Sequence, residues 1–349
     1  MYAKLNRNEL SGGYDVKKLL KWLLLGLMVA LLFGCGNQEE SSGETNEGST
    51  EETKDEGSSE GLETNIVTIA TGGASGPYNI IATALADIYS SEFDVNSRTQ
   101  TTGASVENLN LLAQEKVEMA FVMSDALSQA LEGIESFPEP IENVMQIATL
   151  YPNVVQIVAR ADAGIETIED LKGKRVAVGD QGSGVELNAR ALLNGHGITY
   201  DDMQVDYLGY AEAADGLKAG TIDAAFLTSG LPNASLLELA ETLDINMVAV
   251  DPAKVEEIAK DHPYFVTYEI PADMYGNSQP VPTAAVPNAL VVRSDLSEND
   301  VYLLTKVFFE NLDKLANAHQ AAKDISLEKA QDNLIAPLHP GAERYYNEQ

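Results

Sequence analysis

The sequence predicts an α/β protein with two lobes and a ligand cleft between them. Three observations support this fold class. Short β-branched runs alternate with amphipathic helical patterns, glycine-rich turns join the two, and both kinds of unit occur twice along the chain. Alternating strands and helices favour mainly parallel sheets that helices cover on both faces. Two copies of the pattern therefore predict two lobes.

The strand–turn–helix unit appears first after residue 65. A β-branched run at 66–70 leads into a glycine-rich turn at 71–77. The helical pattern that follows has one apolar face, made of Ile80, Ile81, Ala84, Leu85 and Ile88. The same unit returns as a strand at 175–178, a turn at 179–184 and a helix beyond it. Ser75 in the first turn corresponds to Ser183 in the second.

A second repeat relates residues 112–124 to residues 217–229, and it pairs Phe121 with Phe226. It predicts that the first lobe comprises 66–150 plus about 250–349, and that the second comprises about 151–249. We expect the chain to cross first at Tyr151-Pro152-Asn153 and to return between about 249 and 287, where prolines become frequent. Residues 298–317 read as one long amphipathic helix that packs on the first lobe.

The composition excludes several classes of function. The 349 residues include 22 Lys and Arg against 54 Asp and Glu, a formal net charge of −32. Nucleic acid is excluded as a partner, because its phosphates require basic patches. The single cysteine excludes an internal disulfide and a cysteine-based metal site within one chain. We expect no metal and no cofactor.

The first 34 residues read as a signal peptide with an N-terminal extension. Three lysines precede an apolar run at 22–33, which is shorter than the about 20 residues that a membrane span needs. The basic region begins late, so we hypothesise that Val16 rather than Met1 is the start. Leu32-Phe33-Gly34-Cys35 resembles a bacterial lipobox, which implies lipid attachment at Cys35. The alternative is a buried thiol in a short anchor helix.

Residues 35–65 are predicted to form a disordered acidic tether. From residue 36 onwards they hold ten acidic residues and only Lys54, with almost no apolar side chains. Such a segment does not bury enough apolar surface to offset its ordering entropy. Together with Cys35, it places the folded body on the extracytoplasmic face of the cell membrane, anchored by lipid.

Small and hydroxyl residues follow several of the predicted strands. They lie in turns at 72–76, 102–105, 124–125, 182–184 and 228–230. Glycines let the backbone approach a ligand, and free N–H groups at a helix start favour an anion. The alternative for any single turn is that Ser or Thr simply caps a helix. Because the pattern recurs in both predicted lobes, we expect the turns to converge on a carboxylate in the cleft.

Catalysis is not indicated, and we expect no enzyme. The turn at 72–76 matches neither a dinucleotide-binding motif nor a P-loop, and Gly182-Ser183-Gly184 is not a nucleophile elbow. The four histidines, at positions 196, 262, 319 and 339, are far apart and lack the pattern of a zinc protease.

Twelve separated segments within residues 66–349 carry a more specific pattern. They lie at 71–78, 102–109, 124–125, 150–152, 170–176, 182–184, 188–190, 200–202, 212–215, 232–234, 338–342 and 344–346. In this order they resemble the TAXI family, the solute-binding subunits of TRAP transporters. The resemblance implies a periplasmic-binding-protein type II fold that closes on a small carboxylate, such as glutamate, glutamine or a 2-oxoglutarate-like compound. It also implies delivery of that ligand to an ion-coupled membrane permease.

The resemblance further implies a set of ligand-binding positions. These are Gly73, Ser75, Tyr78, Ser105, Ser124, Tyr151, Ser183, Gly184, Asn188, Phe226 and Thr228. The alternative for Tyr78 and Phe226 is that they pack in the core. The alternative for Tyr151 is that it is a hinge residue without ligand contact. We expect alanine at Ser183 or Tyr78 to weaken binding with little change in stability.

Three functions stay open at this point. The first is a lipid-anchored receptor for a TRAP permease, which the family motifs favour. The second is a binding module that serves a membrane sensor. The third is an enzyme on the same fold.

Overall fold

The computed structural model describes residues 61–349, and these belong to one compact unit. The predicted signal region, the start at Met1 or Val16, the lipid site Cys35 and the tether up to residue 60 lie outside the described residues. No helix within residues 61–349 is long and apolar enough to cross a membrane.

The last residues of the predicted tether are packed on the folded body. The backbone N–H groups of Glu63 and Thr64 donate to the Asp300 carboxylate, at 2.7 and 3.0 Å. Leu62 packs against apolar side chains of the first lobe. A buried carboxylate needs hydrogen-bond donors, and these two N–H groups supply them. The folded part therefore begins earlier than Ile66, where the sequence predicted it to begin.

The first lobe holds three parallel strands in the order β2-β1-β3. They are β1 (Ile66–Ala70), β2 (Asn96–Gln100) and β3 (Met119–Met123). Helices α2 (Pro77–Phe93) and α3 (Ser105–Ala113) connect them, and α4 (Ser124–Glu132) follows β3. The predicted apolar face of α2 is buried at Ile81, Leu85 and Ile88, while Ile80 and Ala84 are half-buried.

The second lobe repeats this unit. Its parallel strands are β5 (Arg175–Ala177), β6 (Gln204–Asp206) and β7 (Ala224–Ser229). Its helices are α5 (Gly184–Gly195), α6 (Tyr210–Ala219) and α7 (Ala234–Thr242). Strands β3 and β7 hold corresponding places in the two lobes, as the repeat in the sequence predicts. Single turns of 3-10 helix lie at η1 (Ala161–Ala163), η2 (Ile168–Leu171), η3 (Tyr200–Asp202) and η4 (Gln320–Asp324).

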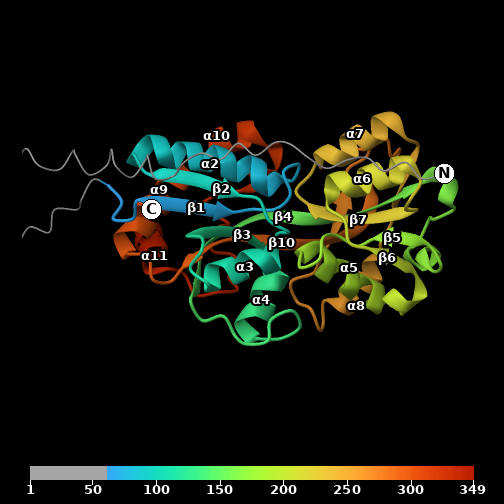
Figure 1. Ribbon diagram of the computed structural model, residues 1–349, viewed down its shortest axis with the longest axis horizontal. Helices are drawn as coiled ribbons and strands as arrows, with labels where there is room; N and C mark the ends of the chain where they lie inside the picture. The colour runs from blue at the N-terminus through green and yellow to red at the C-terminus, as the bar shows by residue number, and fades with distance from the viewer. Residues whose placement is uncertain (1–60) are drawn as a thin grey trace, which may run out of the picture. The chain divides into compact units, whose positions relative to one another are not determined.

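Two long antiparallel strands join the lobes into one sheet. They are β4 (Val144–Arg160) and β10 (Val281–Arg293), and the sheet order is β2-β1-β3-β10-β4-β7-β5-β6. The remaining strands, β8 (Ile245–Val248) and β9 (Val266–Ile270), pair with β4 and β10. Figure 1 shows β4 and β10 running between two groups of helices. The sequence predicted a crossing at residues 151–153 but not that it lies inside one continuous strand.

Two prolines face each other where the lobes meet. Pro152 of β4 is the register partner of Pro287 of β10, and the register shifts between Pro287 and Ala289. Proline has no N–H group, so the ladder between the two strands loses hydrogen bonds there. This weak point in the middle of an otherwise continuous sheet marks the hinge between the lobes.

Each lobe buries apolar side chains on both faces of its half of the sheet. In the first lobe, Ile69 belongs to the cluster under α2 and Ala70 to the cluster under α3 and α4. In the second, α5 and α8 (Pro252–Ile258) cover one face, and α6 and α7 cover the other. Because successive strand residues point to opposite faces, strands buried on both sides read as continuous apolar runs.

The second lobe continues beyond the predicted boundary near residue 250. Val250, Val255 and Phe265 share a core cluster with side chains of α5 and β7. Strand β9 pairs with the first residues of β10, on the same side of the hinge. The chain therefore returns at Pro287, the last residue of the predicted interval, because the packing of α8 and β9 keeps 250–286 with the second lobe.

The predicted helix at 298–317 is two helices. They are α9 (Glu298–Glu310) and α10 (Leu312–Ala318), separated at Asn311, whose φ is −119°. The Asn311 side chain donates to the Val307 carbonyl at 2.8 Å and so supports the break. Both helices pack on the first lobe, as predicted, and α11 (Pro340–Asn347) packs beside α9.

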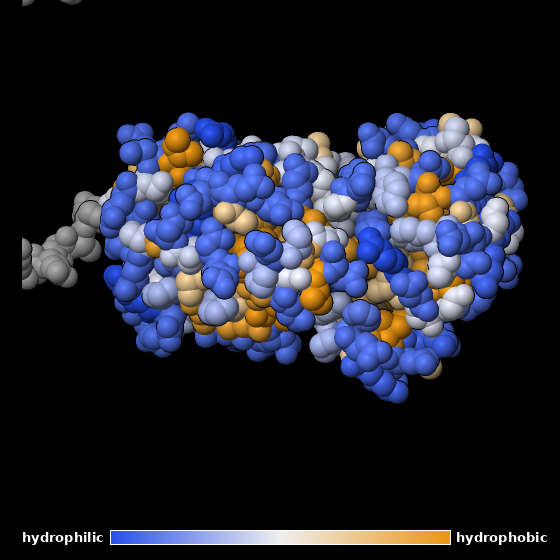
Figure 2. All heavy atoms as spheres, turned by 60° about the horizontal axis from the view of Figure 1, so that its bottom comes forward, coloured by the Kyte–Doolittle hydropathy of each residue, from blue (hydrophilic) through white to orange (hydrophobic). Residues whose placement is uncertain are grey.

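Exposed apolar surface is scattered over the described residues. The large hydrophobic side chains that are exposed belong to different elements, and they are Ile66, Ile134, Tyr207, Leu237 and Val266. The face drawn in Figure 2 is mostly hydrophilic, with its hydrophobic residues in separate small patches. Scattered apolar side chains are normal for a protein surface and indicate no partner.

Phe226 is expected to stabilise the fold rather than to contact ligand. Its side chain is 1% exposed and lies in the core between β7 and α5. We expect Phe226→Ala to lower the free energy of unfolding by about 3–5 kcal/mol, measured by urea denaturation. Leu237→Ala, on an exposed face of α7, should change it by less than about 0.5 kcal/mol. Equal small effects of both substitutions would contradict the core assignment.

Candidate ligand-binding site

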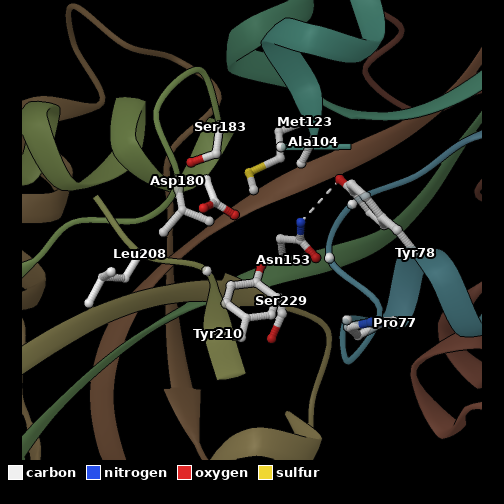
Figure 3. A pocket seen from close by; sticks show the side chains of 16 residues that line it. Pro77, Tyr78, Ala104, Met123, Asn153, Asp180, Ser183, Leu208, Tyr210 and Ser229 are labelled. Carbon is white, nitrogen blue, oxygen red and sulfur yellow. Dashed lines mark hydrogen bonds between the residues drawn. The ribbon is translucent and has the colours of Figure 1, made fainter. Parts of the chain in front are cut away.

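A cavity lies at the hinge, with walls from both lobes and from β4. About 40 Å³ of it is open to the centre of a water-sized sphere, which is room for a few water molecules, so the cavity is nearly closed in this structure. Its lining includes the glycines of the turn after β1 as well as Tyr78, Ala104, Met123, Asn153, Asp180, Ser183, Val185, Leu208, Tyr210 and Ser229. Figure 3 shows Tyr78 and Ala104 on one side and Asp180, Leu208 and Tyr210 on the other, with Asn153 between them.

Five helices begin at the wall of this cavity. The residues that directly precede α2, α3, α4, α5 and α6 all line it, and they are Gly76, Ala104, Met123, Ser183 and Gly209. The side chains of Gly76, Ala104 and Met123 themselves accept no hydrogen bond from the first N–H groups of α2, α3 and α4. Free N–H groups and the positive end of the helix dipole favour an anion. The convergence of strand-to-helix turns that the sequence predicted is therefore present.

Ala104 holds an unusual backbone conformation at this wall. Its φ is 82° and its ψ is −142°, a region that residues other than glycine rarely occupy. The Thr102 hydroxyl accepts a hydrogen bond from the Ala104 N–H at 3.0 Å. Thr102 in turn donates to the buried Asn108 side chain at 2.6 Å. The surrounding contacts thus maintain a costly conformation that directs the start of α3 toward the cavity.

The charge of the lining is negative. Asp180 is its one ionisable acid, and no Lys, Arg or His of the described residues belongs to the lining. Partial burial raises the pKa of Asp180, and the nearby carboxylates of Glu212 and Glu107 raise it further. An anionic ligand therefore finds backbone and hydroxyl donors here but no cationic side chain.

A hydrogen-bonded chain of side chains connects the cavity to both crossing strands. The Asn288 amide of β10 donates to the Tyr151 carbonyl of β4 at 2.8 Å, and the Tyr78 hydroxyl donates to Asn288. The Asn153 amide of β4 then donates to the Tyr78 oxygen at 3.1 Å. Burial raises the pKa of the Tyr78 hydroxyl well above its ordinary value, so it stays a protonated donor. The network links the start of α2 to the hinge.

Comparison with known proteins gives the family. The model of the NMT1-like family matches residues 69–349, which is most of the chain. The chain belongs to the NMT1-like family.

Solved structures with a similar fold have low sequence identity to this NMT1-like chain. A protein from Bordetella bronchiseptica RB50 is 17% identical, with a TM-score of 0.50 over 82% of this chain and 83% of that one. The periplasmic aliphatic sulphonate binding protein SsuA from Escherichia coli is 12% identical, with a TM-score of 0.42 over 82% and 83%. A putative L-cystine ABC transporter from Listeria monocytogenes is 14% identical, with a TM-score of 0.46 over 77% and 99%.

The predicted fold class is confirmed. The chain has a mixed α/β fold of two lobes, and helices cover both faces of its open sheet. The predicted strands are parallel within each lobe, and the crossing strands are antiparallel.

Four of the predicted site residues of this NMT1-like chain reach the cavity or its mouth. Gly73, Tyr78 and Ser183 line the cavity. Ser75 lies at the mouth, where its hydroxyl accepts a hydrogen bond from the Ser235 hydroxyl of the second lobe at 3.2 Å.

Four others lie behind the wall and pack the lobes together. The Ser105 hydroxyl accepts from the Met123 N–H at 3.1 Å. A side chain added at Gly184 would approach both the Met123 sulfur and the Ser105 hydroxyl to 3.0 Å. Ser124 is buried at the start of α4, and Asn188 of α5 donates to the Asp125 carboxylate at 2.6 Å. These positions act through the lining that they support.

The last three are buried among other residues. Phe226 lies in the core of the second lobe. The hydroxyls of Tyr151 and Thr228 are buried, and no described residue forms a hydrogen bond with either of them. The Thr228 carbonyl accepts from the Tyr210 hydroxyl at 2.6 Å, which holds Tyr210 against the cavity.

The expected effect of alanine at Tyr78 and Ser183 needs correction. Tyr78 is 6% exposed, and its ring packs on Phe121 with centroids 5.4 Å apart. The Ser183 hydroxyl caps α5 by accepting from the Glu186 N–H at 3.1 Å. Removing such a cap costs about 1 kcal/mol, and removing a buried aromatic costs several times more. Both substitutions would therefore lower stability as well as binding.

Sequence reasoning missed Asn153, Asp180 and Tyr210. The sequence predicts Asn153 only at the crossing. In the turn after β5, where Asp180 lies, only Gly182, Ser183 and Gly184 have the small or hydroxyl character of the other donor turns. Tyr210 is separated from Ser105 by the 105-residue offset of the repeat, so that offset was a usable signal. Asp180 and Asn153 gave no such signal, because only the folded chain shows which acids and amides face the cavity.

One buried acid forms a hydrogen bond between the two lobes behind the cavity. Asp125 of α4 is 1% exposed and accepts from the Ala126 N–H at 2.8 Å and from the Asn188 amide of α5. Burial raises the pKa of Asp125 to about 7, although both donors oppose the rise. The Asn188 oxygen has no partner among the described residues. If the Asn188 amide group is turned over, its oxygen can therefore accept a hydrogen bond from the protonated Asp125 carboxyl group.

The raised pKa of Asp125 predicts that the free energy of unfolding falls as the pH rises from about 4 to 7. In that window the folded protein keeps a proton on Asp125 that the unfolded chain has released, so folding is favoured by acid. Asp125→Asn mimics the neutral acid. Relative to the unaltered chain, we expect its free energy of unfolding to rise by a few kcal/mol between pH 5 and pH 8, since one pKa unit is worth about 1.4 kcal/mol.

Urea unfolding at several pH values measures this difference. The control is Glu132→Gln on the exposed side of the same helix, which should run parallel to the unaltered chain at every pH. A pH-independent difference for Asp125→Asn would show that Asp125 is ionised throughout.

Proposed function

We propose that this chain is an extracytoplasmic solute-binding receptor that captures a small carboxylate by closing its two lobes. The observation that carries the proposal is the cavity at the hinge, into which the starts of five helices from both lobes are directed. The family membership and the periplasmic-binding-protein fold support it. The TAXI motifs in the sequence support a TRAP-type secondary transporter as the protein that receives the ligand.

Contacts between the lobes support a mechanism of closure. The Tyr210 ring of the second lobe lies so near Gly76 of the first that an added side chain would approach it to 3.2 Å. Asp125 and Asn188 bond across the lobes, as do Ser75 and Ser235. Opening the hinge at Pro152 and Pro287 would break these contacts. A ligand that touches both walls favours the closed state by its greater affinity for that state.

The donor pattern supports a carboxylate as the ligand's anionic group. Each favourable interaction with a helix start is worth about 0.3–1 kcal/mol when exposed and up to about 2 kcal/mol when partly buried. Several of them acting together can hold one carboxylate without an arginine. Long-range attraction does not contribute, since the chain carries a net charge of −32. Capture therefore relies on short-range hydrogen bonds inside a closed cavity.

Binding is tested with L-glutamate, L-glutamine and 2-oxoglutarate on the full chain in detergent. A ligand at about 100 times its Kd stabilises the folded state by about 2.7 kcal/mol, which raises the melting temperature by several degrees. L-glutaminamide, which lacks the α-carboxylate, should give no shift. The absence of a shift with all three compounds would overturn the proposed ligand class.

A transport assay in vesicles separates a transporter receptor from a sensor module. Vesicles that contain a TRAP permease encoded beside this chain should accumulate the bound compound only when the chain is present. A neighbouring histidine kinase without a permease would favour the sensor instead, and chemical conversion of the bound compound would favour an enzyme.

Lipid attachment at Cys35 is part of the proposal. Cys35 is the chain's only cysteine, and Gly34 alone separates it from the apolar segment in the sequence. We expect Cys35→Ser to abolish incorporation of an alkyne-labelled fatty acid in growing cells and to release the protein from the membrane fraction. Ser41→Ala is the control and should keep both. Labelling and retention of Cys35→Ser would exclude this anchor.

A further inference from the structure

The two lobes pack on each other beside the cavity through α4 of the first lobe and α5 of the second (Figure 1). Leu187 of α5 lies in an apolar cluster that includes side chains of α3 and α4. Met123, which directly precedes α4, lies in a cluster of the second lobe. A side chain added at Gly184 would approach the Met123 sulfur to 3.0 Å. Each helix therefore covers residues of the other lobe, and this cover exists only while the lobes are closed.

A carboxyl group is buried in this contact. Asp125, the second residue of α4, is 1% exposed, and it accepts a hydrogen bond from the Asn188 amide of the other lobe at 2.6 Å. The Ala126 N–H of its own helix donates to it at 2.8 Å. No Lys, Arg or His within residues 61–349 forms an ion pair with Asp125. A buried carboxylate without a cation is costly when ionised and much less costly when neutral.

The charged groups nearest to this contact are used elsewhere. Arg190 of α5 bonds Glu186 of the same helix at 2.6 Å and Glu135 of the first lobe at 3.6 Å. Burial raises the pKa of the Tyr264 hydroxyl, in the loop before β9, and the nearby Asp125 carboxylate raises it further. Strand β3 carries no titratable group. The other titratable groups near Asp125 or on elements packed against α4 are His262 beside Tyr264, Tyr78 of α2, Glu107 of α3, Arg293 of β10 and Glu132 of α4 itself.

The contact also holds acceptor atoms that lack donors. The side-chain oxygens of Asn188 and of Gln129, one turn after Asp125 on α4, are buried and have no partner among the described residues. A proton on Asp125 supplies a donor, which the Asn188 oxygen accepts once that amide group is turned over. Burial raises the pKa of Asp125 to about 7, although the Ala126 N–H and the Asn188 amide oppose the rise. Closed lobes therefore favour the protonated acid.

Opening the hinge reverses this situation. When α5 moves away, water reaches the Asp125 carboxylate, while the Ala126 N–H and the start of α4 still favour its ionised form. We propose that closure of the lobes takes up one proton from solution on a carboxylate oxygen of Asp125, and that opening releases it. An O–H bond forms on Asp125, its charge changes from −1 to 0, and no other reactant takes part. This rests on the lobe closure of the proposed function and adds its control by pH.

Acid favours the closed state under this proposal. Between about pH 4, near the ordinary pKa of an aspartate, and about pH 7, closed molecules keep a proton that open molecules have released. The ratio of closed to open molecules then falls by up to about tenfold for each pH unit and stays level outside this window. Since the ligand is held by the closed state, its apparent affinity follows the closed fraction. Acid would promote capture and alkali would promote release.

The experiment measures the distance between the lobes in the full chain, in detergent and without any ligand. Cys35→Ser removes the native thiol, and Asp87→Cys on α2 and Glu241→Cys on α7 give one exposed position on each lobe for a nitroxide label. Pulsed electron spin resonance gives the populations of the closed and open distances. From about pH 5 to pH 8, we expect the closed-to-open ratio to fall by at least about tenfold. With Asp125→Asn added, the ratio should change by less than about twofold.

Further variants separate Asp125 from its neighbours. Histidines change charge near neutral pH, and His262 bonds the Tyr264 hydroxyl at 2.9 Å, so His262→Gln is the first control. Glu132→Gln, on the exposed side of α4, is the second, and both should keep the fall. Asn188→Asp has the opposite expectation. A second acid facing Asp125 raises the pKa of the pair, so the fall should continue above about pH 7, which a loss of packing alone would not cause.

Each outcome decides one part of the proposal. Equal pH dependence with and without Asp125→Asn, or loss of the pH dependence in His262→Gln, would overturn the role of Asp125. Separate closed and open distances whose ratio does not change with pH would overturn proton uptake, while lobe closure still stands. One single distance in every protein and at every pH would overturn lobe closure together with this inference.

Discussion

The pairing of β4 with β10 is the interaction on which the rest of the structure depends. These two strands are the continuous link between two lobes that otherwise repeat the same parallel unit. Their ladder is strong within each lobe and weak at Pro152 and Pro287, where neither residue donates a hydrogen bond. The same region carries Tyr151, Asn153 and Asn288, so the hinge and the base of the cavity are made by the same few residues. In the proposed mechanism, movement of the lobes and occupancy of the cavity are therefore coupled through the backbone of β4 and β10.

On the proposed function, the cavity binds an anion although the chain is strongly acidic. A chain with a net charge of −32 gains nothing from long-range attraction when it captures an anion. Helix starts avoid this problem because their N–H groups act over hydrogen-bonding distance and add no net charge.

Much of the fold follows from local patterns in the sequence. The turn after residues 66–70, the repeat that pairs Phe121 with Phe226, and the buried positions of α2 all arise from alternation and spacing that neighbouring residues specify. The boundary of the second lobe and the break of the C-terminal helix at Asn311 do not. They depend on the packing of α8 and β9 and on one side-chain contact, which a one-dimensional pattern does not record.

The sequence by itself determined the two-lobed α/β class and the repeated donor turns, because glycine turns between strands and helices converge at strand ends. Its resemblance to the TAXI motifs indicated Gly73, Tyr78 and Ser183, which line the cavity. Only the tertiary structure decided the polarity of the cavity. Asp180 is one of 54 acidic residues, and nothing in its local sequence separates it from the others. Asn153 donates to the Tyr78 oxygen because Asn288, 135 positions further along the chain, accepts the Tyr78 proton. The direction of a hydrogen bond passes through contacts between distant segments, and those contacts exist only once the chain has folded.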